Sequence, residues 1–225
     1  MISDRLKTVA EMTTRGNIVA DIGTDHGYVP IYLVENQICE KVYAMDIKDG
    51  PLKIADKNIA MKELESNIET IKSDGMEKLK DNMVQTVIIA GMGGELMVNI
   101  LKKGENIKGI KEFVLCPHRR VDMVREYLLE KNWKIVDEKM LIDGGKYYTV
   151  MKAKKGCEKI SYDETEIKYG RILLKNKDNI LKKYLEKEYS KFYDILNTMK
   201  KSNSENISRI EQVIYLNREA YKVYD

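Results

Sequence analysis

Short apolar runs alternate with amphipathic stretches through residues 1–153 of the chain. The apolar runs predict strands at 18–22, 41–46, 68–72, 84–90 and 112–116. Between them, apolar residues spaced three or four positions apart predict helices at 3–14, 29–37, 51–65, 94–103 and 119–131. The run VQTVIIA at 84–90 is almost wholly apolar, which is typical of a strand buried on both faces of a parallel sheet.

Two further strand-like stretches close this region on either side of a glycine turn. They cover about 134–142 and 146–153, and Asp143-Gly144-Gly145 between them is a hairpin signal. Repeated strand–helix units that end in a hairpin indicate a doubly wound, three-layer, Rossmann-like α/β sheet with an antiparallel edge. We assign residues 1–158 to this domain.

From about residue 163 only helical spacing remains. Two stripes recur at intervals of three and four: Leu181, Leu185, Glu188, Phe192, Ile195 and Met199, then Ile207, Ile210, Ile214, Asn217 and Tyr221. The polar break KKSNSEN at 200–206 separates them, with Ser204 as the expected N-cap. We therefore predict a coiled-coil-like antiparallel helical hairpin within 159–225, which either projects from the α/β domain or folds back onto it.

Composition narrows the class of protein. Hydrophobic residues make up 43% of the 225 residues, enough for a sizeable core, and no apolar run approaches the 18 residues of a membrane span. The first residues, MISDRLKTVAEMTTRGN, have no signal-peptide core, so we expect a cytoplasmic protein, either a monomer or a homodimer. Cys39, Cys116 and Cys157 are far apart, which predicts reduced thiols and no metal site.

The net charge of +3 is unevenly distributed. Residues 151–225 carry 17 Lys and Arg against 12 Asp and Glu, whereas the rest of the chain is slightly acidic. A basic C-terminal part suits a polyanionic partner such as nucleic acid, although lysine-rich helices are often merely solvated.

The turn after the first predicted strand has an unusual composition. It reads D-I-G-T-D-H-G, from Asp21 through Gly23 and Asp25 to Gly27, where a dinucleotide site would have G-x-G-x-x-G. A carboxylate beside a pyrophosphate is repelled, whereas S-adenosylmethionine has no phosphate and carries an ammonium and a sulfonium. This turn therefore favours S-adenosylmethionine, with Asp21 and Asp25 directed at its methionine end.

Two later strand ends fit the same cofactor. Asp46 ends the second predicted strand, where an acid accepts hydrogen bonds from the ribose hydroxyls. After the third strand, Asp74 can accept from the adenine amino group, and Gly75 and Met76 can line the base. The alternative interpretation of Asp74-Gly75 is a plain turn.

The fourth strand runs into the turn Gly91-Met92-Gly93-Gly94, which by the carboxyl-end rule faces the ligand. Many nucleic-acid amino methyltransferases place an Asn or Asp there to hold an exocyclic amine, and this turn has neither. A target nitrogen with a free lone pair is then favoured. The alternative is that the glycines only allow a tight entry into the next helix.

Together these motifs resemble those of the bacterial tRNA (adenine(22)-N1)-methyltransferase family. The matching segments are DIGTDHGYVP at 21–30, AMDIKDGPL at 44–52, SDG at 73–75, IAGMGG at 89–94, SDRL at 3–6 and the C-terminal hairpin. The resemblance implies a class I methyltransferase fold, S-adenosyl-L-methionine as cofactor and tRNA as substrate. It places the cofactor at Asp21, Gly23, Asp25, His26, Gly27, Tyr28, Asp46, Ile47, Asp74, Gly75, Met76, Ala90, Gly91 and Met92.

The expected reaction is attack of the adenine N1 lone pair on the sulfonium methyl, for which positioning supplies most of the rate. Tyr28 or Met92 is expected to hold the extruded base. Asp25 either stabilises the cationic product or only binds cofactor, and His26 either has a structural role or acts in acid–base chemistry. We list Asp25 and His26 as candidate catalytic residues.

One stretch departs from the resemblance. Family members tend to carry Gln-Pro-Asn-like residues after the fifth strand, where this chain has Cys116-Pro117-His118-Arg119-Arg120. Arg119 and Arg120 are expected to contact phosphate there. The tRNA body would meet helix lysines, with neighbouring tyrosines either in the core or stacked on bases; these are Lys182, Lys183, Lys187, Lys191, Lys200 and Lys201, and Tyr184, Tyr189 and Tyr193.

Two other functions remain open from the sequence. A methyltransferase of a small molecule or a protein would share the cofactor turn but would need no basic surface. A non-enzymatic RNA-binding protein on the same fold would bind no S-adenosylmethionine. A nucleotide-dependent oxidoreductase is disfavoured by Asp25, because its carboxylate would face the pyrophosphate.

Overall fold

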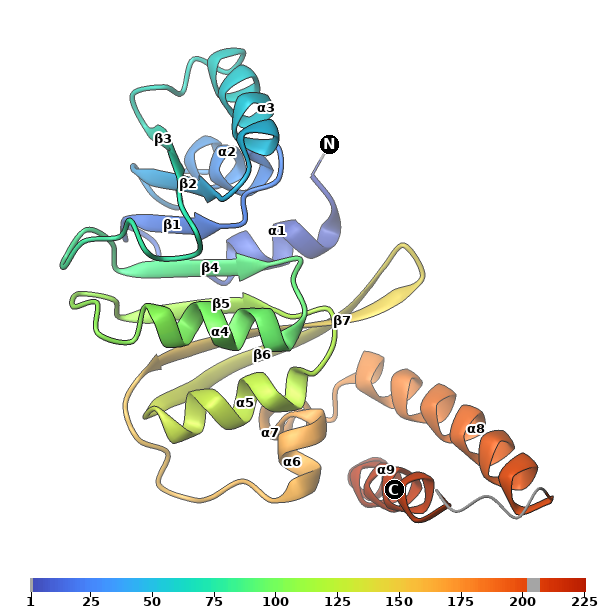
Figure 1. Cartoon of the computed structure of the whole chain (residues 1–225). Coiled ribbons are helices and arrows are strands. Elements are labelled where there is room, and N and C mark those ends of the chain that lie inside the picture. Colours follow the sequence, from blue (N-terminus) through green and yellow to red (C-terminus); the bar gives the residue numbers. More distant parts are fainter. Residues whose placement is uncertain (1, 202–206) are drawn as a thin grey trace.

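A computed structural model describes residues 2–201 and 207–225 and shows an α/β domain followed by C-terminal helices (Figure 1). The strands are β1 Val19–Ile22, β2 Val42–Asp46, β3 Ile68–Lys72, β4 Thr86–Ala90, β5 Glu112–Cys116, β6 Trp133–Asp143 and β7 Lys146–Lys155. They form one sheet in the order β3-β2-β1-β4-β5-β7-β6. β1 to β5 are parallel, and β7 pairs antiparallel with both β5 and β6, which confirms the predicted doubly wound sheet with an antiparallel edge.

Helices cover both faces of this sheet. α1 Asp4–Glu11, α2 Tyr28–Glu35 and α3 Asp49–Ala60 pack on one face, and α4 Gly94–Lys103 and α5 Val121–Glu130 pack on the other. The first of the two cores includes Val9, Leu33 and Ile59, and the second includes Met97 and Leu128. β4 and β5 are buried on both faces, which fits their mostly apolar sequences; only their first residues, Thr86 and Glu112, are polar.

Helix boundaries differ from the predicted ones by a few residues. The helix expected at 51–65 runs from Asp49 to Ala60, because Pro51 fits the first turn and Glu63 has a φ of 57°, which a helix cannot continue through. Ser3 caps α1, since its side chain accepts the Leu6 N–H at 3.4 Å. The expected N-cap Ser204 lies outside the described residues.

The C-terminal part contains more than the predicted hairpin. Two short helices, α6 Glu164–Tyr169 and α7 Arg171–Lys175, precede α8 Asn179–Lys201 and α9 Ile207–Tyr221, and a 3₁₀ turn at Lys222–Tyr224 ends the chain. α8 packs against α9, as predicted, while α6 packs against α5 and α7 against β6. Figure 1 shows α6 and α7 attached to the α/β domain and α8 extending away from it.

Candidate functional site

Two carboxylates lie at the carboxyl ends of neighbouring parallel strands. Asp21 is in β1, and Asp46 is the last residue of β2. Asp21 is buried, with only 5% of its surface exposed. Burial raises the pKa of Asp21 to about 7, and the negative charge of Asp46 contributes to the rise. Such a pair is costly on its own and favours a ligand that brings positive charge.

The turn after β1 is held in a left-handed conformation. Gly23, His26 and Gly27 have φ values of 77°, 61° and 72°. The Gly23 N–H donates to the Met45 carbonyl at 2.7 Å, which folds the turn over the end of β2. A Cβ on Gly23 would lie 2.1 Å from the Met92 methyl carbon, so the Met92 side chain rests on Gly23, and the left-handed φ disfavours any other residue there.

Three predicted site residues contact one another in sequence at the start of α2. The Asp25 carboxylate is well exposed, and its Oδ1 lies 3.0 Å from His26 Nε2. The His26 ring stacks on Tyr28, with ring centroids 5.6 Å apart and an angle of 22° between the planes. Tyr28 is 39% exposed, which leaves it free to contact a further planar group.

The residues predicted to contact the adenine of the cofactor differ in how accessible they are to a ligand. The Asp74 carboxylate forms an ion pair with Lys103 at 2.5 Å, so a ligand would have to compete with that ammonium. Gly75 has a φ of 57°, and Met76 is 1% exposed, with its side chain in the core near α4. Ile47, which follows β2, is 55% exposed.

The predicted glycine turn and the turn after β5 are held together by backbone contacts. β4 ends at Ala90, which is half-buried, and Gly91 follows with a φ of 83°. The Met92 carbonyl accepts the His118 N–H at 2.8 Å. A Cβ on Gly94 would lie 2.4 Å from the Arg120 carbonyl oxygen, so the two turns touch because Gly94 has no side chain.

We call the residues at the carboxyl ends of β1, β2 and β4 the strand-end site; they are Asp21, Gly23, Asp25, His26, Tyr28, Asp46, Gly91 and Met92. Arg119 and Arg120 lie beside it at the start of α5. Both are exposed, with Glu95 at 3.9 Å from Arg119 and 3.7 Å from Arg120. Arg120 also donates to Asp122 at 3.3 Å, so the Arg119 guanidinium is the less engaged of the two and the more available to phosphate.

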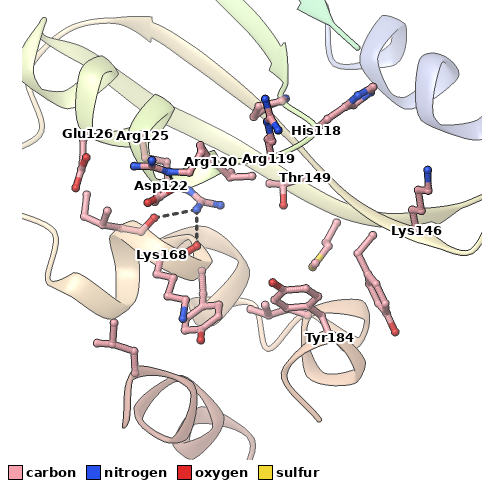
Figure 2. Close-up of a pocket in the computed structure, with 18 of the residues that line it drawn as sticks. His118, Arg119, Arg120, Asp122, Arg125, Glu126, Lys146, Thr149, Lys168 and Tyr184 are labelled. Carbon is pink, nitrogen blue, oxygen red and sulfur yellow. Dashed lines mark hydrogen bonds and ion pairs between the residues drawn. The ribbon is translucent and has the colours of Figure 1, made fainter. Parts of the chain in front are cut away.

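A cleft of about 830 Å³ opens between α5, the β6–β7 hairpin and the C-terminal helices (Figure 2). We call it the basic cleft; its cationic lining residues include Arg119, Arg120, Lys146, Lys168 and Lys187. Aromatic side chains line it as well, and Tyr147 and Tyr184 meet edge to face with centroids 5.4 Å apart. Cationic and aromatic groups in one cleft suit single-stranded nucleic acid.

A buried ion pair fixes one wall of the basic cleft. The Arg125 guanidinium of α5 donates to Glu138 at 2.7 Å, and the two side chains are 1% and 0% exposed. Arg125 also donates to the backbone carbonyls of Ile167 and Lys168, both at 2.9 Å (Figure 2). A Cβ on Gly170 would lie 2.6 Å from Glu138, so glycine is needed where α6 meets α7.

A second buried carboxylate organises the hairpin. Glu188 of α8 accepts hydrogen bonds from Tyr169 at 2.6 Å, Tyr184 at 3.0 Å and Asn217 of α9 at 3.0 Å. Burial, followed by the charge of Glu188, raises the pKa of both tyrosines. Tyr184 therefore belongs partly to the core. Tyr193 is 46% exposed and stacks on Tyr189 at 5.7 Å.

The polar residues that anchor the C-terminal helices were not predicted from the sequence. Arg125 stands between Val124 and Leu128 on the buried face of α5, and a charge in such a stripe is a signal for a buried partner. Glu188 and Asn217 did appear in the predicted stripes, but their polarity was not interpreted. Nothing in the local sequence indicates which residues they meet.

The described residues contain neither a metal-binding cluster nor a membrane-spanning helix. No cluster of three or more His, Cys, Asp or Glu is arranged to hold a metal ion in residues 2–201 and 207–225. Over the same described part of the chain, the helices are too polar or too short to cross a membrane.

The parallel sheet with an antiparallel edge, acids at its strand ends and glycine turns define a class I S-adenosylmethionine-dependent methyltransferase. A family model described as a methyltransferase domain matches residues 2–151. The chain belongs to the bacterial tRNA (adenine(22)-N1)-methyltransferase family. It is 35% identical to the tRNA (adenine(22)-N(1))-methyltransferase of Bacillus subtilis over 173 residues, which are 76% of this chain and 73% of that protein.

Solved structures of similar proteins match the fold of this chain over both the α/β domain and the C-terminal helices. The crystal structure of the B. subtilis m1A22 tRNA methyltransferase TrmK has a TM-score of 0.89 at 29% identity and covers 98% of this chain and 99% of that one. TrmK of M. capricolum, solved with S-adenosyl-homocysteine, has a TM-score of 0.89 at 32% identity and covers 100% of both chains.

Proposed function

We propose that this protein transfers a methyl group from S-adenosylmethionine to N1 of adenine 22 in tRNA. The observation that carries the proposal is the similarity to the B. subtilis enzyme, which in structure extends over 98% of this chain and therefore includes the C-terminal helices. A methyltransferase of small molecules would share the sheet but would not need the basic cleft.

The strand-end site fits the cofactor on physical grounds. The buried carboxylate of Asp21, with Asp46 close enough to raise its pKa, suits a cationic ligand and repels a diphosphate. We assign Asp46 to the ribose hydroxyls, and Asp21 with Asp25 to the ammonium of the methionine part. When bound, S-adenosylmethionine supplies an electrophilic methyl group.

The remaining predicted cofactor residues have positioning roles in this proposal. Asp74 accepts a hydrogen bond from the adenine amino group, which replaces its ion pair with Lys103. Backbone groups complete the site at Gly23, Gly27, Ile47, Gly75, Met76, Ala90 and Gly91. The Met92 side chain, which rests on Gly23, separates the cofactor turn from the incoming base.

In this proposal the two parts of the chain have different functions. We assign cofactor binding and methyl transfer to residues 1–158 and the grip on tRNA to residues 159–225 together with the basic cleft. Tyr28, already stacked on His26, offers a platform for the extruded adenine. Asp25 and His26 lie next to Tyr28. The Asp25 carboxylate, whose Oδ1 is 3.0 Å from His26 Nε2, can there balance the positive charge of the methylated base.

Methyl transfer to unmodified tRNA with labelled S-adenosylmethionine tests the proposal. We expect the label in 1-methyladenosine, and loss of the label when adenine 22 is replaced by another base. Label in any other nucleoside would contradict the assignment of the target. Binding of tRNA without any cofactor binding in calorimetry would contradict the assignment as an enzyme.

A further inference from the structure

The glycine turn after β4 offers little that can receive the amino group of an adenine. Between Gly91 and Gly94 no side chain carries a hydrogen-bond acceptor other than the thioether of Met92. The backbone is partly engaged, since the Gly91 N–H donates to the Cys116 carbonyl at 3.3 Å and the Met92 carbonyl accepts from His118 at 2.8 Å. A side-chain acceptor for the amino group therefore has to come from a neighbouring element, and backbone carbonyls of the turn are the alternative acceptors.

The His118 imidazole lies beside this turn. Its Nε2 is 4.0 Å from the position that a Cβ on Gly91 would take. The ring meets Tyr148 in an edge-to-face contact, with centroids 5.4 Å apart and an angle of 62° between the planes. The same turn contacts the cofactor loop through Met92 on Gly23, so it connects His118 with the strand-end site.

The charged groups around His118 favour its neutral form. Burial lowers its pKa below the usual 6.5, and the positive charges of Arg5 on α1 and Lys146 on β7 lower it further. Asp143, at the end of β6, faces Arg5 at 3.8 Å, and Tyr148 contributes only its ring. A neutral imidazole keeps one nitrogen lone pair as an acceptor.

We propose that His118 accepts a hydrogen bond from the N6 amino group of the target adenine and thereby selects adenine at the methylation site. The inference rests on the proposed function and names a residue that determines its specificity. Guanine would present a carbonyl oxygen to the imidazole lone pair and a protonated N1 to the methyl group, and both arrangements are unfavourable.

The same hydrogen bond assists the reaction. The N1 lone pair forms the new bond to the methyl carbon, and the electron pair of the broken carbon–sulfur bond stays on sulfur. The products are S-adenosylhomocysteine and a cationic 1-methyladenine, and no proton has to leave. Because the positive charge spreads onto the amino group, its hydrogen bond to a neutral imidazole strengthens as the methyl is transferred.

The test compares His118→Phe, which keeps a ring against Tyr148, with His118→Asn, which keeps a neutral acceptor. Each variant is assayed on tRNA with adenine at position 22 and on tRNA with purine, which has N1 but no amino group. We expect His118→Phe to lower kcat/KM on adenine about 10- to 100-fold, the value of one hydrogen bond to a group that gains charge. On purine, wild type and His118→Phe should react equally, and cofactor affinity should change less than twofold.

The pH profile adds a second readout. Protonation removes the acceptor, so wild-type kcat/KM on adenine should fall as the pH drops through the pKa of His118, below 6.5. With S-adenosylmethionine kept saturating at every pH, His118→Asn should retain most activity and lose that limb, while Asp21 and His26 are present in both proteins and cancel in the comparison.

Equal activity of His118→Phe and wild type on adenine would overturn the inference. An equal loss on adenine and on purine would also overturn it, because it would show a structural role. If the wild-type chain forms no 1-methyladenosine at all while it still binds cofactor, the proposed function itself fails and the inference with it.

Discussion

The strand-end site and the basic cleft lie next to each other, but they carry opposite charge and draw their residues from different kinds of element. In the strand-end site two acids, Asp21 and Asp46, end parallel strands whose cores are apolar. In the basic cleft the lining cations come from separate elements: Arg120 precedes α5, Lys146 starts β7 and Lys187 is on α8.

The two sites are held in place by different interactions. Strand order alone brings Asp21 and Asp46 to one edge of the sheet, and the apolar layers on both faces keep it rigid. The basic cleft depends on the attachment of the C-terminal helices, in which Arg125 donates to the Ile167 and Lys168 carbonyls and Glu138 accepts the Ile172 N–H. An apolar cluster that includes Leu173 and Met140 packs at the same junction. The buried charged contacts specify a position more than they add net stability.

Arg125→Ala should have the largest effect and should separate the two sites. It leaves the Glu138 carboxylate buried without its partner, which we expect to lower the free energy of unfolding by about 3–5 kcal/mol, measured by denaturant unfolding. Cofactor affinity of the folded protein should stay within twofold of wild type, whereas the KM for tRNA should rise.

A double variant, Arg125→Met with Glu138→Leu, serves as the control. It removes both charges, so it should recover part of the stability lost by the single variant. A single variant as stable as wild type would show that this pair does not anchor the C-terminal helices.

Asp46→Ala should act on the strand-end site alone. Loss of hydrogen bonds to a charged group should weaken S-adenosylmethionine binding by about 1–3 kcal/mol in calorimetry. Glu69→Ala, which changes an exposed acid near the opposite end of the neighbouring strand β3, is the matched control and should leave cofactor affinity unchanged. Unchanged affinity in Asp46→Ala would remove this residue from the ribose site.

The pH dependence of cofactor binding probes Asp21. Its pKa of about 7 means that the carboxylate, the form that attracts a cation, increases as the pH rises. Between pH 6 and pH 7 the ionised fraction grows from roughly 9% to 50%, so affinity should increase about fivefold. Asp21→Asn should bind more weakly and should lose this dependence; a profile that stays the same in Asp21→Asn would assign it to another group.

Lys187→Ala should give the smallest change, and only in the basic cleft. Removing one phosphate contact should lower tRNA affinity a few-fold and reduce the slope of log K against log salt by roughly 1. Lys182→Ala is the control on the same helix, since Lys182 does not line the basic cleft: its ammonium lies over the rings of Tyr221 and Tyr224, whereas that of Lys187 lies over Tyr147 in the cleft. Equal effects of both variants would mean that α8 attracts tRNA by charge alone.

Local patterns in the chain were sufficient for the α/β domain and for part of the site. Alternating apolar runs predict the strands, and the position of Asp21 and Asp46 after two of them predicts that they converge. Left-handed turns and close approaches, such as Met92 on Gly23, needed the structure, because glycine in a sequence does not show what lies against it. α6 and α7 were missed because each is shorter than two helical turns.

The local pattern of the chain was enough to predict the parallel sheet and the edge at which its acids meet, because parallel strands put their carboxyl ends on one side. Where the C-terminal helices attach, and which side chain lies beside the glycine turn, followed from the packing of the folded chain. Arg125 meets the Ile167 carbonyl, and His118 lies beside Gly91, across long stretches of chain. Contacts of that kind depend on how finished elements pack, and no local periodicity encodes them.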